Sequence, residues 1–207
     1  IRNNMNMTRR ALGAAAIVFS LTLTSATLAQ QAARIRGQIE KVDGAMLSLK
    51  ARDGTVLNVK VADNARVAAL VKATLADIKT DSFIGIAGIP EADSSIKAFS
   101  IHIFLPAQRG VVPDRHGPWD AKPGSTMTNG YVADMQSKDG QTLTVKHKDG
   151  EKKIIVTKDT VIAAVAPGKK EELVVGVPII IMSSEKQADG SVLAKTIYVG
   201  RAGPPAM

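Results

Sequence analysis

Apolar and polar residues alternate in short runs from Arg34 onwards, and turn residues separate the runs. Alternation with a period of two is the pattern of a strand that has one buried face. Asp-Gly dipeptides, which favour tight hairpins, follow the first two runs. The pattern predicts five strands in the first half of the chain, at 34–42, 46–51, 55–61, 82–89 and 96–105.

The period lengthens between residues 68 and 79, where Leu70, Leu75 and Ile78 are spaced as on one face of a helix. We therefore expect one or two helical turns between the third and the fourth strand. The predicted order is three strands, a short helix and two strands.

The same order returns in the second half of the chain at an offset of 93 to 96 residues, for example in Asp53-Gly54 and Asp149-Gly150. A constant offset over five strands indicates two copies of one module, 34–105 and 128–201. Each copy is so small that it would be marginally stable by itself. The predicted fold class is all-β, with two tandem OB-like five-stranded barrels, each with a short helix between strands 3 and 4.

The connector between the copies, 106–127, has no counterpart in the repeat. It holds four prolines and three glycines, which exclude a helix or an inner strand, and it holds the only tryptophan of the chain. Any function that the copies do not share is expected there. The predicted ligand-binding residues are Arg109, Arg115, His116, Trp119 and Asp120. In the alternative interpretation, the buried indole ring only fixes the connector onto a barrel.

The two ends of the chain are expected to lie outside the barrels. Residues 1–29 resemble a signal peptide, with basic Arg9 and Arg10, a mostly apolar stretch and small residues before the cleavage site. We expect cleavage near Ala29 and Gln30 and a periplasmic product that is not an integral membrane protein. A retained anchor and a twin-arginine export route remain alternatives. Residues 202–207 are expected to be a disordered tail.

Composition narrows the possible partners. The sequence has no cysteine, which excludes disulfides, thiolate metal sites and cysteine nucleophiles. Its net charge is +8; without the first 29 residues, 24 basic residues stand against 19 acidic ones, which leaves +5. This modest excess, with few aromatic side chains, argues against nucleic acid, since single-strand binders stack bases along a basic groove. An envelope protein, a small ligand or an anionic envelope polymer are the expected partners.

No set of catalytic residues stands out, and the protein is predicted not to be an enzyme. Serine and lysine have catalytic spacing at Ser94/Lys97 and Ser183/Lys186, but both pairs fall at predicted hairpins, where no helix brings lysine over serine. No phosphate-binding loop and no zinc-protease motif is present in the sequence.

The expected function is that of a non-catalytic, soluble periplasmic binding or interaction protein. A metal site is the main alternative function, and an envelope scaffold or stress protein that binds anionic polymers is the second. His116, Trp119 and Met127 are similar to the His, Trp and Met set of small periplasmic carriers, in which soft ligands hold Cu(I) or Ag(I). The predicted metal ligands are His116 and Met127. His102 and His147 are expected to be structural, His102 at a surface and His147 at a strand end.

Several motif positions carry a resemblance to a known family. They are Gly37 and Ile39, Asp43-Gly44 with Leu47 and Leu49, Asp53-Gly54, and Ala98 with Ile101 and Ile103. With them the chain resembles exported bacterial proteins that share a domain of unknown function and are often labelled automatically as metal ABC transporter permeases. The resemblance implies an OB-like barrel without assigned catalytic residues. The permease label conflicts with the sequence, because a permease needs several apolar spans of ~20 residues.

Overall fold

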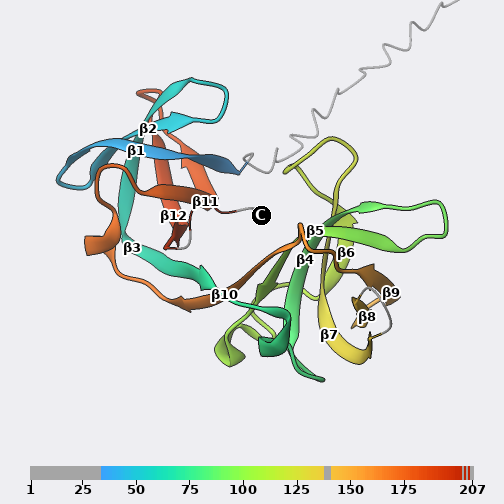
Figure 1. Cartoon of the computed structure of the whole chain (residues 1–207). Coiled ribbons are helices and arrows are strands. Elements are labelled where there is room, and N and C mark those ends of the chain that lie inside the picture. The colour runs from blue at the N-terminus through green and yellow to red at the C-terminus, as the bar shows by residue number, and fades with distance from the viewer. Residues whose placement is uncertain (1–33, 138–140, 202, 204, 206–207) are drawn as a thin grey trace, which may run out of the picture. The chain divides into compact units, whose positions relative to one another are not determined.

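The structure, a computed structural model, describes residues 34–137, 141–201, 203 and 205, and they form an all-β unit (Figure 1). The predicted signal peptide, 1–29, lies outside the described residues. The strands are β1 (Ile35–Asp43), β2 (Met46–Ala51), β3 (Val56–Lys72), β4 (Phe83–Pro90), β5 (Ile96–Ile103), β6 (Arg115–Pro118), β7 (Thr126–Ser137), β8 (Gln141–His147), β9 (Gly150–Ile155), β10 (Val161–Pro167), β11 (Pro178–Lys186) and β12 (Val192–Gly200). The helical segments in this part of the chain are three 3-10 turns, η1 (Leu75–Asp77), η2 (Pro106–Gln108) and η3 (Lys170–Glu172).

Five strands close into a barrel. β1 pairs with β2 and β11, β2 pairs with β3, and β11 pairs with β12, all antiparallel, while β12 closes the ring by pairing in parallel with β3. The apolar face of each strand points inward, so Leu49, Val59 and Ile197 are fully buried in one cluster. The predicted alternation of apolar and polar residues is therefore confirmed in these strands.

The remaining strands follow a second closed path of pairings. β4 pairs with β5 and β7, and β8 pairs with β7 and β9, all antiparallel. Two parallel pairs, Ile96 with Ile154 and Lys97 with Ile155, join β5 to β9 and complete the path. Ile84, Ile86, Ile101 and other apolar residues of these strands form a separate buried cluster.

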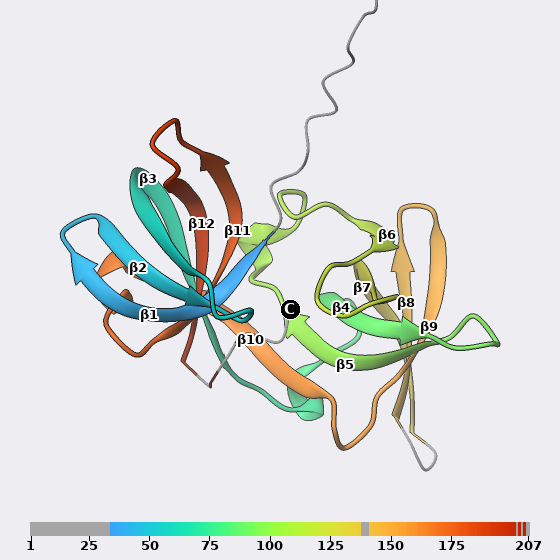
Figure 2. The ribbon, with the colours of Figure 1, turned by 90° about the horizontal axis from the view of Figure 1, so that it is seen from above.

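The strand partners differ from the prediction that each copy forms its own barrel. The first copy gives β1–β3 to the barrel and β4–β5 to the second ring, and the second copy gives β7–β9 to the second ring and β11–β12 to the barrel. Blue and red strands therefore lie together in Figures 1 and 2, and green strands lie with yellow and orange ones. The prediction of tandem barrels is wrong because the last two strands of either copy have the same apolar alternation and can complete either ring.

Each copy therefore exchanges its last two strands with the other copy, and the two copies meet where β3 pairs with β10. β3 continues beyond the barrel and pairs with β10 antiparallel, with Leu70 opposite Val165 and Ala68 opposite Pro167. Leu70 and Val165 are equivalent positions of the two copies, at an offset of 95 residues. An approximate two-fold axis therefore passes between them, and it relates the pairing of β3 with β12 to that of β10 with β5.

The predicted short helix at 68–79 is not confirmed. Residues 68–72 belong to β3, and only η1 follows, with Asp77 accepting hydrogen bonds from the backbone N–H and the hydroxyl of Thr74. The end of β3 lies between β10 and β12, so neighbouring Ala69 and Leu70 are both buried. A strand that is buried on both faces loses its alternation, and its apolar run imitates helical spacing.

Two further expectations concern membrane segments and the tail. No helix of the described residues is long and apolar enough to cross a membrane. In the predicted tail, Pro205 is buried, and its carbonyl oxygen accepts a hydrogen bond of 3.0 Å from Arg52 Nη2.

Candidate ligand-binding cavity

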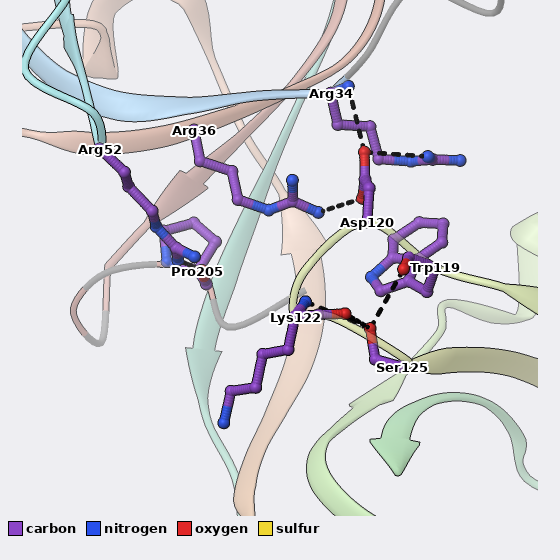
Figure 3. Close-up of polar contacts among 8 residues, drawn as sticks. All are labelled: Arg34, Arg36, Arg52, Trp119, Asp120, Lys122, Ser125 and Pro205. Carbon is purple, nitrogen blue, oxygen red and sulfur yellow. Dashed lines mark hydrogen bonds and ion pairs between the residues drawn. The ribbon is translucent and has the colours of Figure 1, made fainter. Parts of the chain in front are cut away.

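The connector is a structured element with contacts to both rings. Its β6 pairs with β7 at an edge, where proline is tolerated, and Pro118 ends the strand. The loop that follows is closed by Ser125, whose carbonyl oxygen accepts a bond of 2.8 Å from Trp119 N–H. Its Oγ lies 2.7 Å from Lys122 O and 3.1 Å from Trp119 O (Figure 3). At the other end of the connector, Gln108 Nε2 donates to the Tyr198 hydroxyl at 2.9 Å.

Trp119 fixes this loop between the two rings. Its side chain is 8% exposed and packs in a buried cluster with residues of β3, β4, β7, β10, β11 and β12. The guanidinium carbon of Arg34 lies 3.7 Å from the centre of the indole ring, a cation–π geometry. The burial agrees with the interpretation of Trp119 as a structural anchor.

The next residue, Asp120, ties the connector to the start of the barrel. It accepts a hydrogen bond of 2.8 Å from Arg36 Nη2, and Arg34 Nη1 lies 3.4 Å from its other oxygen (Figure 3). Burial opposes the ionisation of Asp120, but the bond from Arg36 and the two arginine charges outweigh it and hold its pKa below the usual value. Asp120 is therefore an anion that partly neutralises this arginine pair.

A cavity of about 760 Å³ lies next to this anchor. One wall is the outer face of the barrel, meaning the face that points away from its interior, and the other wall comes from β6, β7 and the segment after β5. The connector contributes the rest of the lining. The lining residues are Arg34, Arg66–Ala68, Phe104, Ala107, Gln108, Val111–Pro113, Arg115, Trp119, Met127, Asn129, Met182, Ser183, Thr196 and Tyr198.

Polar side chains of the barrel wall form one row across three strands. Ser183 of β11 is the pairing partner of Thr196 in β12, and Thr196 is the partner of Arg66 in β3. β-Bulges adjoin these pairs, and all three residues line the cavity, so two hydroxyls and a guanidinium face the same space. No hydrogen bond or ion pair occupies these three side chains among the described residues.

The opposite wall carries a second row. Arg115 of β6 is paired with Asn129 of β7, and Asn129 with Gly85 of β4. A Cβ atom at position 85 would lie 2.9 Å from Asn129 Oδ1 and 2.9 Å from the ring of Phe104, so a larger residue there would displace one of these two side chains. Asn129 is 7% exposed, and its Nδ2 donates to Pro113 O at 3.0 Å, which holds the connector against β7.

The charge of the lining is positive. Arg34, Arg66 and Arg115 line the cavity, whereas no aspartate or glutamate is among its described lining residues. The pKa of Arg34 is lowered, first because the group is buried and also because Arg115 and Arg36 are close, although Asp120 opposes the shift. A further anion near these groups would relieve their mutual repulsion.

Unpaired buried polar atoms concentrate at the same place. Of the five buried side-chain atoms without a hydrogen-bond partner among the described residues, three belong to lining residues: Arg34 Nε, Trp119 Nε1 and Asn129 Oδ1. Each such atom costs about 1–3 kcal/mol, and such exceptions need a reason such as function or bound water. The three atoms lie behind the cavity surface, so direct contacts with a ligand would come from the guanidinium groups, the hydroxyls and the apolar wall.

The predicted binding residues are only partly brought together. Arg115 and Trp119 line the cavity. Asp120 does not line it but binds Arg34, which does. Arg109 lies outside the lining: its Nη1 is 3.1 Å from Asp81 Oδ2, and its guanidinium lies over the ring of Tyr131. His116 also lies outside, with Nδ1 2.8 Å from Thr128 Oγ1.

The two predicted metal ligands do not meet. His116 is paired with Thr128, and Met127 is paired with Gly117, so the side chains of His116 and Met127 point to opposite faces of the sheet. Met127 packs in the buried cluster around Trp119, whereas the His116 ring lies 5.7 Å from that of His147. Among the described residues, no group of three or more histidines and carboxylates could hold a metal ion.

The expected surface position of His102 is wrong, and the expected strand-end position of His147 is confirmed. His102 is 1% exposed rather than at a surface, because β10 pairs with β5 and brings Ala163 beside it. Its Nε2 lies 3.3 Å from Ser100 Oγ, its Nδ1 has no partner in the described part of the chain, and burial lowers its pKa to about 3. His147 ends β8 beside the turn at Asp149, whose N–H lies 3.3 Å from its Nδ1.

Arg34, Arg66 and Tyr198 are cavity residues that the sequence did not single out. A signal was present for Arg66: its equivalent in the second copy is Val161, so a charge stands in one copy where the other is apolar. No family model, curated protein or solved structure matches the chain. The resemblance to exported proteins therefore stays a prediction, and function has to be argued from this geometry.

Proposed function

We propose that the protein is a non-catalytic binding protein that holds a small ligand in the cavity beside Trp119. The observation that carries the proposal is the cavity itself, whose volume of about 760 Å³ falls within the ~300–1,000 Å³ of small-molecule sites. Its wall is mainly apolar, with a few convergent polar groups, which is the usual composition of such sites.

The fold supports a ligand site at this position. We take the second ring of pairings as a second OB-like barrel, since its strands follow the order of the first ring and it is also closed by a parallel pair. The ligand then lies between the outer faces of two barrels, where the connector covers it. This is the place that the sequence predicted for a function not shared by the two copies.

The lining supports binding rather than catalysis. Its described side chains include no histidine, cysteine, aspartate, glutamate or lysine, the groups that most often serve as general bases or nucleophiles. Ser183 and Thr196 thus have no neighbouring base in the lining to activate them.

Export to the periplasm stays part of the proposal, and it rests on residues 1–29.

The test is a thermal-shift screen of small molecules against the wild type and two variants. Ala107→Phe places a ring in the lining from the exposed turn η2, and Ala76→Phe makes the same change in the exposed turn η1, away from the cavity. A ligand at 100 times its Kd stabilises the protein by about 2.7 kcal/mol. We expect compounds that stabilise the wild type and Ala76→Phe but not Ala107→Phe. Compounds that stabilise Ala107→Phe as much as the wild type, or turnover of a compound, would contradict the proposal.

A further inference from the structure

We infer that the ligand of this cavity is an organic anion with an apolar body. The inference rests on the proposed function and adds the chemical class of the ligand. Three observations carry it: the sign of the charges, the hydrogen-bonding groups that are free, and the apolar part of the wall.

The charges select an anion. Three arginines line the cavity, and Asp120, the acid beside Trp119, is bound to Arg34 and Arg36. Arg66 and Arg115 have no ion pair or hydrogen bond among the described residues. Guanidinium groups bind carboxylate, sulfonate and phosphate oxygens with two parallel hydrogen bonds, so these two side chains offer strong contacts to an anionic group.

The free hydrogen-bonding groups point the same way. Arg66, Thr196 and Ser183 lie side by side across three strands, and all three can donate to oxygen. Asn129, on the other wall, uses its Nδ2 for Pro113 O, and its Oδ1 is buried behind the surface. The accessible polar groups are thus mainly donors, which suit an acceptor-rich group.

The rest of the wall requires an apolar body. Phe104, Val111, Val112 and Pro113 lie on the connector side, and Met182 lies on the barrel side. Methionine side chains adapt to ligands of different shape, and Met127 also lines this space. An inorganic anion would leave this apolar surface uncovered, so the class is an organic anion rather than free phosphate or sulfate.

A matched pair of fluorescent probes tests the ligand class. 8-Anilinonaphthalene-1-sulfonate carries a sulfonate on the same rings as N-phenyl-1-naphthylamine, which is neutral. Each is titrated into the full chain, with quenching of Trp119 as a second signal, because Trp119 is the only tryptophan and lines the cavity. We expect one sulfonate probe to bind per chain at least tenfold more tightly than the neutral probe, and we expect its affinity to fall as salt is added.

Three charge variants locate the anion. Arg66→Gln and Arg115→Gln should each weaken the sulfonate probe about tenfold and leave the neutral probe unchanged. Arg109→Gln is the control, since it removes the same charge from the connector outside the lining. Arg66 and Arg115 are exposed, so the variants should fold, which circular dichroism and thermal melting will check.

The outcomes separate the ligand class from the site. Suppose that Ala107→Phe blocks both probes. Equal affinity for the two probes, or a sulfonate affinity that Arg66→Gln and Arg115→Gln do not change, would then overturn the inference that the ligand is an anion. If Ala107→Phe blocked neither probe, the cavity would not be the site, and the proposed function would fail as well. Displacement of the sulfonate probe by inorganic sulfate, at constant ionic strength, would overturn the need for an apolar body.

Discussion

The buried imidazole of His102 should make the stability of the fold depend on pH. Its pKa is about 3 in the folded chain because burial disfavours the charged ring, whereas a histidine in an unfolded chain has a pKa of about 6.5. Above pH 6.5 the ring is neutral in both states. Below that pH the imidazole is protonated in the unfolded chain but stays neutral in the folded chain. The free energy of unfolding therefore falls by about 1.4 kcal/mol per pH unit until the pH approaches 3. Between pH 7 and pH 5 the loss is about 2 kcal/mol.

Urea denaturation at pH 7 and pH 5 measures this loss in the wild type and in His102→Gln, which cannot titrate. The pH range stays above the titration of most carboxylates, so their effect is small. His116 contributes with the same sign, because burial and the charges of Lys152 and His147 lower its pKa, and His116→Gln therefore serves as a control. We expect His102→Gln to lose most of the pH dependence. The argument is refuted if the wild type and His102→Gln lose equal stability between the two pH values.

Two further predictions concern the anchor and the strand exchange. Trp119→Ala should cost about 3–5 kcal/mol in urea denaturation, since it removes a large ring that is 8% exposed, and Trp119→Phe should cost less; unchanged stability would show that the ring is not an anchor. Lys60→Cys with Leu193→Cys should form a disulfide within one chain, because the two residues are paired partners in β3 and β12 and the chain has no other cysteine. The control pair is Lys60→Cys with Lys97→Cys, where Lys97 is the repeat equivalent of Leu193. Gel mobility after oxidation distinguishes the two, and cross-linking of the control pair alone would mean that each copy closes its own ring.

The strands could be predicted from the sequence, but their partners could not. Alternation of apolar and polar residues shows which face of a strand is buried, and Leu49 and Val145, which follow this alternation, lie in two separate interiors. It does not show which strand lies alongside, because two copies of one module offer the same faces. The helix between the third and fourth strands failed for a related reason, since pairing on both edges and burial on both faces of β3 depend on contacts with the other copy.

The site was predictable only where it departs from the repeat. The connector stood out because it has no counterpart, and Arg115 and Trp119 do line the cavity. Arg109 and His116 were expected with them on sequence proximity alone, yet their strand and turn positions direct them elsewhere. The other wall comes from β3, β11 and β12, whose closeness to the connector depends on the strand exchange.

The difference between the two copies is concentrated on the outer faces, and this locates function more sharply than either copy does alone. Interior positions stay aliphatic in both copies, and several keep the same residue, as in Ile84 and Ile179, Ile86 and Ile181, and Ile101 and Ile197. Outward neighbours differ: Gly85 corresponds to Ile180, and His102 corresponds to Tyr198. The cavity of about 480 Å³ beside His102 holds the residues equivalent to Val67 and Ala68; in its described lining the positive charges are Lys72 and Lys158 and not arginines. An approximate two-fold axis alone would create two similar sites. Arg66 stands where the other copy has Val161, and the connector covers only one of the two places, so we expect ligand binding on that side alone.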